Sequence, residues 1–113
     1  MDQLEGEKQA RIRELNDALR RQQIGGRVMV TAGLAAQGEQ VVLAVTQAVA
    51  AFDKFDGDND PYGEHDCAVV EVGDLRIIWK IDYYDLDLKL HSPDPADLSV
   101  TTRVLTIMLA SEY

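Results

Sequence analysis

The chain has 113 residues, of which 46% are hydrophobic and 27% charged, and it carries a formal net charge of −9. Its length predicts a single domain over residues 1–113, large enough to bury a core without a metal or a disulfide. The hydrophobic fraction excludes a disordered chain, and the acidic balance argues against direct binding to nucleic-acid phosphates. The single cysteine, Cys67, indicates a reducing, cytoplasmic setting. No apolar run approaches the ~20 residues that a membrane span needs.

The N-terminal half of the sequence predicts a helix, a strand and a second helix. The first helix is expected from Asp2, which can cap it, to Gln23, with apolar residues at helical spacing on one face. These apolar residues are Leu4, Ile12, Leu15 and Leu19. Two glycines end the helix, and the β-branched segment Arg27 to Thr31 predicts a short strand. Residues 32–38 are expected to form a loop, and valines at helical spacing predict a second helix over 39–52.

The C-terminal half predicts a hairpin and a last helix. After a polar loop, residues 67–72 and 75–83 alternate as paired strands around a Gly-Asp turn. Ile77, Trp79 and Ile81 should then share the buried face of the second strand. A final helix is expected over about 99–111. The predicted fold is therefore α+β, with the order α-β-α-β-β-α and a small antiparallel sheet of about three strands that has helices on one face.

The negative charge is confined to one part of the chain. Residues 52–97 hold thirteen of the twenty acidic residues but only four of the eleven basic ones, which accounts for the full −9. The first acidic cluster comprises Asp53, Asp56, Asp58, Asp60, Glu64 and Asp66. The second comprises Asp82, Asp85 and Asp87. If the sheet brings the two clusters together, they form a single acidic field.

Such a field is typical of a docking surface for a basic partner. Carboxylates along a rigid edge can imitate the phosphates of DNA and occupy the basic groove of a nucleic-acid-binding protein. Tyr62, Tyr83 and Tyr84 lie among the acids and are candidate anchors, since interfaces favour tyrosine. On this interpretation all nine acids, together with Tyr62 and Tyr84, contact the partner. The protein itself contacts neither nucleic acid nor membrane, and it is a monomer or a homodimer.

Several alternatives remain open. Glu64-His65-Asp66 together with Asp82 and Asp85 could form an uncharacterised enzyme site or a metal-dependent hydrolase site, which requires His65 and these carboxylates to converge on one pocket. The segment from Asp56 begins like an EF-hand loop but lacks the required glycine and glutamate, so no metal or cofactor is predicted. The domain could instead be structural or homo-oligomeric. The acids could also be a solvated loop, or be paired internally with first-helix arginines or with basic residues of the hairpin.

Four segments together resemble one family of small bacterial proteins. They are DNDPYGEHD (58–66), WKIDYYDLDL (79–88), SPDPAD (92–97) and VTTRVLTIMLASEY (100–113). They resemble the domain-of-unknown-function family 3768, which brings no established activity and no assigned catalytic residues. The resemblance implies a setting on plasmids, prophages and integrated islands. That setting favours the docking interpretation, with an anti-CRISPR or anti-restriction inhibitor as its specific form.

Overall fold

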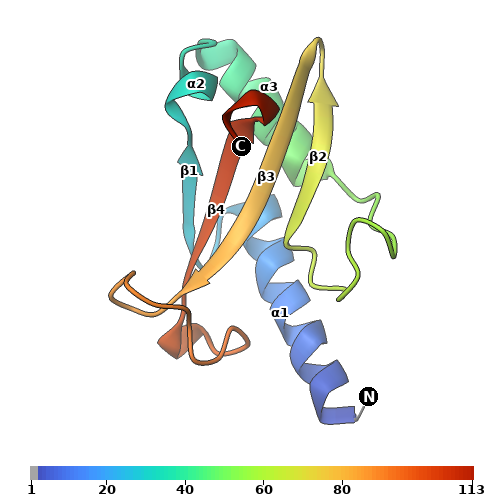
Figure 1. Ribbon diagram of the computed structural model, residues 1–113, viewed down its shortest axis with the longest axis vertical. Helices are drawn as coiled ribbons and strands as arrows, with labels where there is room; N and C mark the ends of the chain where they lie inside the picture. Colours follow the sequence, from blue (N-terminus) through green and yellow to red (C-terminus); the bar gives the residue numbers. More distant parts are fainter. Residues whose placement is uncertain (1–2) are drawn as a thin grey trace.

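A four-stranded mixed sheet forms the centre of the protein in the computed structural model, which describes the backbone of residues 3–113 and the side chains from residue 6 onward (Figure 1). The strands lie in the order β1-β4-β3-β2. The edge strand β1 (Arg27–Val30) runs parallel to β4 (Thr102–Leu109). The long strand β3 (Leu75–Tyr84) runs antiparallel both to β4 and to the other edge strand, β2 (Cys67–Val72).

The two long helices, α1 (Gln3–Gln22) and α3 (Glu39–Ala51), lie together on one face of this sheet (Figure 1). A four-residue helix, α2 (Ala32–Ala35), occupies the segment expected to be a loop. The α+β class and the helices on one face are confirmed. The expected capping residue Asp2 and the side chain of Leu4 lie outside the described residues.

The final helix predicted over 99–111 is wrong, because this segment forms the central strand β4. Two short 3-10 turns flank the strand, η1 (Leu98–Val100) and η2 (Ala110–Glu112). The segment is rich in β-branched residues, and β4 has buried residues on both of its faces. A strand buried on both faces gives an almost continuous apolar run, which periodicity cannot distinguish from a buried helix. The sheet therefore has four strands instead of about three, and it is mixed because β1 runs parallel to β4.

The hydrophobic core fills the space between the helices and the sheet. Trp79 lies at its centre with no exposed surface, and Ile77 and Ile81 flank it on the same face of β3, as predicted. The helices and the other strands contribute further buried side chains: Leu19, Leu34, Val45, Val49, Leu105 and Ile107. Burial of each such side chain stabilises the fold by about 1.5–3 kcal/mol.

A single carboxylate binds the C-terminus of the chain to the residues that follow β1. Glu112 accepts hydrogen bonds from the Thr31 hydroxyl at 2.7 Å and from the backbone N–H groups of Gly33 and Leu109 at 3.0 and 2.9 Å. A Cβ at Gly33 would lie 2.5 Å from this carboxylate, so a larger residue there would displace the carboxylate from its position. These contacts position the exposed Tyr113 over the face of the sheet that carries no helix.

A buried arginine joins α1 to the end of α3. The Nη1 atom of Arg20 donates to the carbonyls of Val49, Ala50 and Phe52 at 2.8–3.1 Å, which satisfies carbonyl groups that a helix end leaves unpaired. Its Nη2 atom donates to Asp17 at 3.2 Å, and the side chain has no exposed surface. Together with the backbone bond from the Phe52 N–H to the Val49 carbonyl, this side chain holds the end of α3 and the start of the acidic segment that follows it.

Replacing this arginine should be strongly destabilising. Arg20→Ala is expected to lower the free energy of unfolding by more than about 3 kcal/mol, because it removes the side-chain donor of three carbonyls at the end of α3 and opens a cavity beside Trp79. Urea denaturation followed by tryptophan fluorescence measures this loss. The neighbouring exposed variant Arg21→Ala should stay within about 0.5 kcal/mol of the wild type. Equal losses for the two variants would contradict the proposed capping role.

Candidate functional site

The topology of the sheet places the two acidic clusters at the same end of the molecule. Because β2 and β3 are antiparallel, β2 begins where β3 ends, with Cys67 paired with Lys80. The segment before β2 (53–66) and the segment after β3 (85–97) therefore both emerge at this end of the sheet (Figure 1). The opposite end carries the turn between the two strands and the start of α3.

The acidic segment 53–66 is folded around one buried carboxylate. Asp60 is 8% exposed, and its Oδ1 atom accepts hydrogen bonds from the backbone N–H groups of Glu64 and His65, both at 3.1 Å. The imidazole of His65 stacks on Phe55 with the ring centroids 3.8 Å apart, and its Nδ1 atom lies 2.9 Å from Asp17 on α1. His65 adopts a left-handed backbone conformation with φ at +54°, which costs about 1 kcal/mol and is offset by these contacts.

Polar side chains of α1 hold this segment against the sheet. Arg13 donates to the carbonyl of Gly63 and Asn16 to that of Glu64, each at 3.0 Å. Asn16 also donates to the hydroxyl of Tyr83 at 2.8 Å, and this hydroxyl donates to the Glu64 carboxylate at 2.8 Å. Burial raises the pKa of Tyr83 well above its ordinary value, so its hydroxyl remains a donor at neutral pH.

The same asparagine reaches the central strand. Its Oδ1 atom accepts a hydrogen bond at 2.8 Å from Nε of Arg103, whose side chain is fully buried, donates to the carbonyl of Pro95 and lies over the ring of Tyr83. Neither Asn16 nor Arg103 was a candidate from the sequence. A signal was present for Asn16, because this polar residue falls at helical spacing from Ile12 and Leu19 on the apolar face of the first helix.

The structure therefore divides the eleven residues expected to contact a partner according to their exposure. Five are exposed: Asp53, Asp56, Asp58, Tyr62 and Asp87. Five are half-buried: Glu64, Asp66, Asp82, Tyr84 and Asp85. Asp60 is buried and bonded within its own loop. Within the described residues, no arginine of the first helix forms an ion pair with an acid of this loop. Arg13 holds the loop by donating to the backbone carbonyl of Gly63 instead.

Because the fold buries some charged groups, the net charge of the surface is more negative than that of the whole chain. The charged side chains that the fold buries, among those described, are Arg20, Arg103 and Asp60. Because this set contains two cations and one anion, the surface carries more negative charge than the formal −9 of the whole chain. The two arginines bond largely to backbone carbonyls and an amide, so they do not neutralise the exposed acids.

The expected convergence of an enzyme site is not seen. His65 lies on the helix side of the acidic segment, against Phe55 and Asp17, whereas Asp66 and Asp82 line a hollow beside the sheet. Within residues 6–113, no group of three or more His, Cys, Asp or Glu side chains is arranged to hold a metal ion. Asp56, which starts the EF-hand-like sequence, accepts hydrogen bonds from the backbone N–H groups of Asp58 and Asn59, both at 2.9 Å.

The hollow arises from a break in one edge of the sheet. The last β2 pairing is Cys67 with Lys80, and the next residue paired on that side of β3 is His91, opposite Tyr84. Between these positions the Ile81 N–H donates to the backbone carbonyl of Asp66 at 2.7 Å, and the Tyr83 carbonyl accepts the Ser92 N–H at 3.0 Å, so the part of the edge without a strand partner is short. A hollow of about 520 Å³ extends from this break along β2 to Tyr113, and a second of about 360 Å³ extends to His91.

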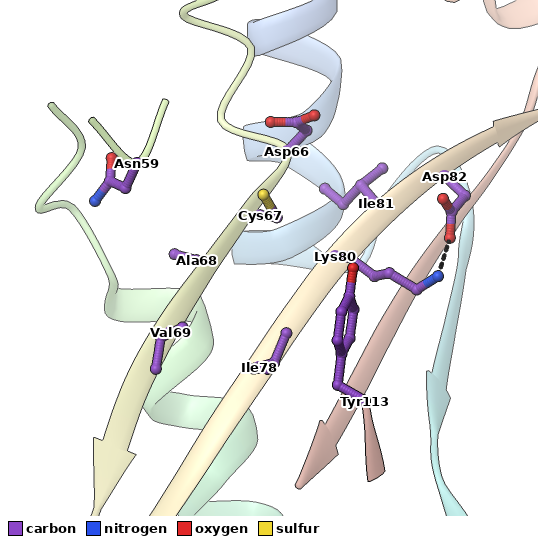
Figure 2. Close-up of a pocket in the computed structure, with 10 residues that line it drawn as sticks. All are labelled: Asn59, Asp66, Cys67, Ala68, Val69, Ile78, Lys80, Ile81, Asp82 and Tyr113. Atoms are coloured by element: carbon purple, nitrogen blue, oxygen red, sulfur yellow. Dashed lines mark ion pairs between the residues drawn. The ribbon is translucent and has the colours of Figure 1, made fainter. Parts of the chain in front are cut away.

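The two hollows meet at Asp66, Ile81 and Asp82, which line both of them. Figure 2 shows the two carboxylates on either side of Ile81, with the Lys80 ammonium bonded to Asp82 at 3.1 Å. Burial, and then the neighbouring acids Glu64, Asp60 and Asp82, raise the pKa of Asp66. Burial also raises the pKa of the Cys67 thiol, so this cysteine is not activated as a nucleophile.

Fold and surface together define a small α+β protein with an acidic end. The chain belongs to the family described as protein of unknown function (DUF3768), whose family model matches residues 30–112. This match confirms the resemblance noted from the four sequence segments. No curated protein and no solved structure matches the chain. None of the described helices has the length and apolar character needed to cross a membrane.

Removing the buried carboxylate should release the acidic segment. Asp60→Ala is expected to cost about 2 kcal/mol of unfolding free energy, since two backbone N–H groups lose their acceptor. Residues 53–66 should also become much faster to exchange amide hydrogens, as measured by mass spectrometry. Asp58→Ala, at an exposed position in the same loop, should change neither quantity. Unchanged exchange in Asp60→Ala would show that α1 alone orders the segment.

The raised pKa of Asp66 predicts a specific pH dependence. A carboxyl group whose pKa is higher in the folded than in the unfolded protein destabilises the fold wherever it is ionised in both states. Asp66→Asn should therefore raise the free energy of unfolding at pH 7. The gain should shrink as the pH falls through the folded-state pKa, and it should disappear below the ordinary aspartate value of about 4. Urea denaturation of both proteins across this range measures the difference, and a gain independent of pH would contradict its electrostatic origin.

Proposed function

We propose that the protein is an acidic binding module that inhibits a partner by occupying a basic surface on it. The observation that carries this proposal is the segregation of charge in the fold. Buried arginines are withdrawn from the surface, while both acidic clusters emerge at one end of the sheet. A rigid field of one sign attracts a partner of the opposite sign and accelerates association.

The rigidity of this end supports a docking role over a merely solvated loop. Arg13 and Asn16 on α1 hold the segment 53–66. The segment after β3 is held by a hydrogen bond from the backbone N–H of Ser92 to the carbonyl of Tyr83. Fixed carboxylates lose less conformational entropy on binding than those of a mobile loop. Tyr62 lies within the first of these segments with 70% of its surface accessible, so it offers an aromatic side chain for contact with a partner.

The basic groove of a nucleic-acid-binding complex of host defence is the target that we propose. Grooves that bind DNA present rows of lysine and arginine to phosphates, and fixed carboxylates can take the place of those phosphates. The mobile-element setting that the family resemblance implies makes CRISPR and restriction complexes the first candidates. The module is then a DNA mimic that competes with nucleic acid for the groove.

Charge-neutral variants at the acidic end test this function. The variant Asp53→Asn/Asp58→Asn/Asp87→Asn removes three exposed charges whose side chains make no hydrogen bond within the described residues. Phage plating efficiency is measured in bacterial hosts that each carry one defined CRISPR or restriction system and express the protein. The wild type should raise plating on at least one host, and the variant should lose roughly tenfold or more of this protection.

A matched control places the same charge change at the opposite end of the sheet. Glu39→Gln/Glu71→Gln/Asp74→Asn also removes three exposed carboxylates, and it should protect as well as the wild type. Retention of the purified target on immobilised protein should fall steeply with salt for the wild type and less steeply for the acidic-end variant. Equal protection by all three proteins, or no protection on any host, would refute the proposed function.

A further inference from the structure

The edge break beside β3 combines the features of a site for a cationic side chain. Asp66 and Asp82 lie on either side of Ile81 at the junction of the two hollows (Figure 2). Asp82 uses one oxygen to bind Lys80, which leaves its other oxygen available. Asp66 accepts no side-chain hydrogen bond and forms no ion pair within the described residues, although it is half-buried and close enough to three other acids for their charges to act on it.

The backbone of Asp66 accepts the Ile81 N–H at 2.7 Å, but its carboxylate has no side-chain partner within the described residues. The other nearby acids each have donors: Asp60 accepts two backbone N–H groups, Glu64 accepts the Tyr83 hydroxyl, and Asp82 binds Lys80. Burial and like charges make the ionised form of Asp66 unfavourable, and an added cation would relieve both effects. A carboxylate in this position is therefore complementary to a positive charge supplied from outside the chain.

The wall of the larger hollow is mostly apolar, whereas that of the smaller one is mixed and includes Lys89 and His91. Val69, Ile78 and Tyr113 line the larger hollow, and the hydroxyl end of Tyr113 lies near Lys80 (Figure 2). Leu90 and Tyr84 line the smaller one, and Leu90 is 71% exposed. A ligand that fits this groove carries a cation at its middle and apolar groups on either side, and it lies along the edge of the sheet.

We propose that this groove binds an arginine side chain presented by an extended, apolar-flanked segment of the partner protein. The guanidinium lies between Asp66 and Asp82, and the apolar neighbours contact Tyr113 on one side and Leu90 on the other. Arginine fits better than lysine because its planar fork can donate to two carboxylates at once and can stack on a tyrosine ring. The inference rests on the proposed function, and it names the contact that anchors the basic partner.

A peptide with one arginine between leucines tests the groove directly. Its binding to the isotopically labelled full chain is followed by NMR, with a Kd at or below about 1 mM expected. The largest chemical-shift changes should fall on residues 66, 81, 82 and 113. The same peptide with neutral citrulline in place of arginine should bind roughly tenfold more weakly, because the charge-assisted hydrogen bonds are lost.

Two variants and a control locate the charge. Asp66→Asn and Asp82→Asn should each weaken the binding of the arginine peptide roughly tenfold, because each variant keeps the shape of the groove but removes one charge. Asp66→Asn should remain folded, since it removes a carboxylate whose ionised form burial makes unfavourable. The control Asp58→Asn changes an exposed acid that lines neither hollow and should bind like the wild type. Equal binding of the citrulline peptide, or shifts confined to residues 53–58, would overturn the inference.

This test separates the groove from the broader acidic surface. The acidic-end triple variant retains Asp66 and Asp82, so it should still bind the arginine peptide even where phage protection is lost. If Asp66→Asn loses the peptide but protects a host as well as the wild type, the groove does not anchor the partner, and the proposed function stands without it. Loss of both peptide binding and protection in Asp66→Asn supports the inference.

Discussion

The structure depends on the docking of the acidic segment 53–66 onto the polar residues of α1. Asn16 and Arg20 are buried on a helix face that is otherwise apolar, and between them they reach the acidic segment, the end of α3, and strands β3 and β4. Buried polar groups are costly when they lose their hydrogen bonds, so these contacts permit few alternative arrangements of the segment. One helix thereby fixes the position of the acidic end relative to the sheet.

This docking also determines where the charge resides. A chain with eleven basic residues could have neutralised part of its acidic segment through ion pairs on the surface. The fold instead buries Arg20 and Arg103 against carbonyl and amide oxygens, and it leaves Asp53, Asp58 and Asp87 in solvent. The repulsion among these acids weakens the fold, and the hydrophobic core around Trp79 offsets it.

Hollow and acidic surface have different origins in the chain. The acidic surface follows from composition, since residues 52–97 contain the whole excess of acids. The hollow follows from strand lengths, because β3 continues past the first residue of β2 and, beyond the bond between Asp66 and Ile81, the chain returns to this edge at His91 and Ser92. Asp66 belongs to both features. Its place in the hollow could not be predicted, since the pairing of Cys67 with Lys80 sets it and a shift in register would move it.

The sequence by itself determined the first helix, the hairpin and its buried face, the second long helix and the confinement of charge, because each depends on local periodicity or on counting. Only the tertiary structure decided that residues 102–109 form a strand, because β4 gains its hydrogen bonds from β1 and β3, which are distant in sequence. It also decided which acids are available to a partner. Asp60 and Asp58 are two residues apart and chemically identical, yet one is buried as the centre of its loop and the other is exposed to solvent.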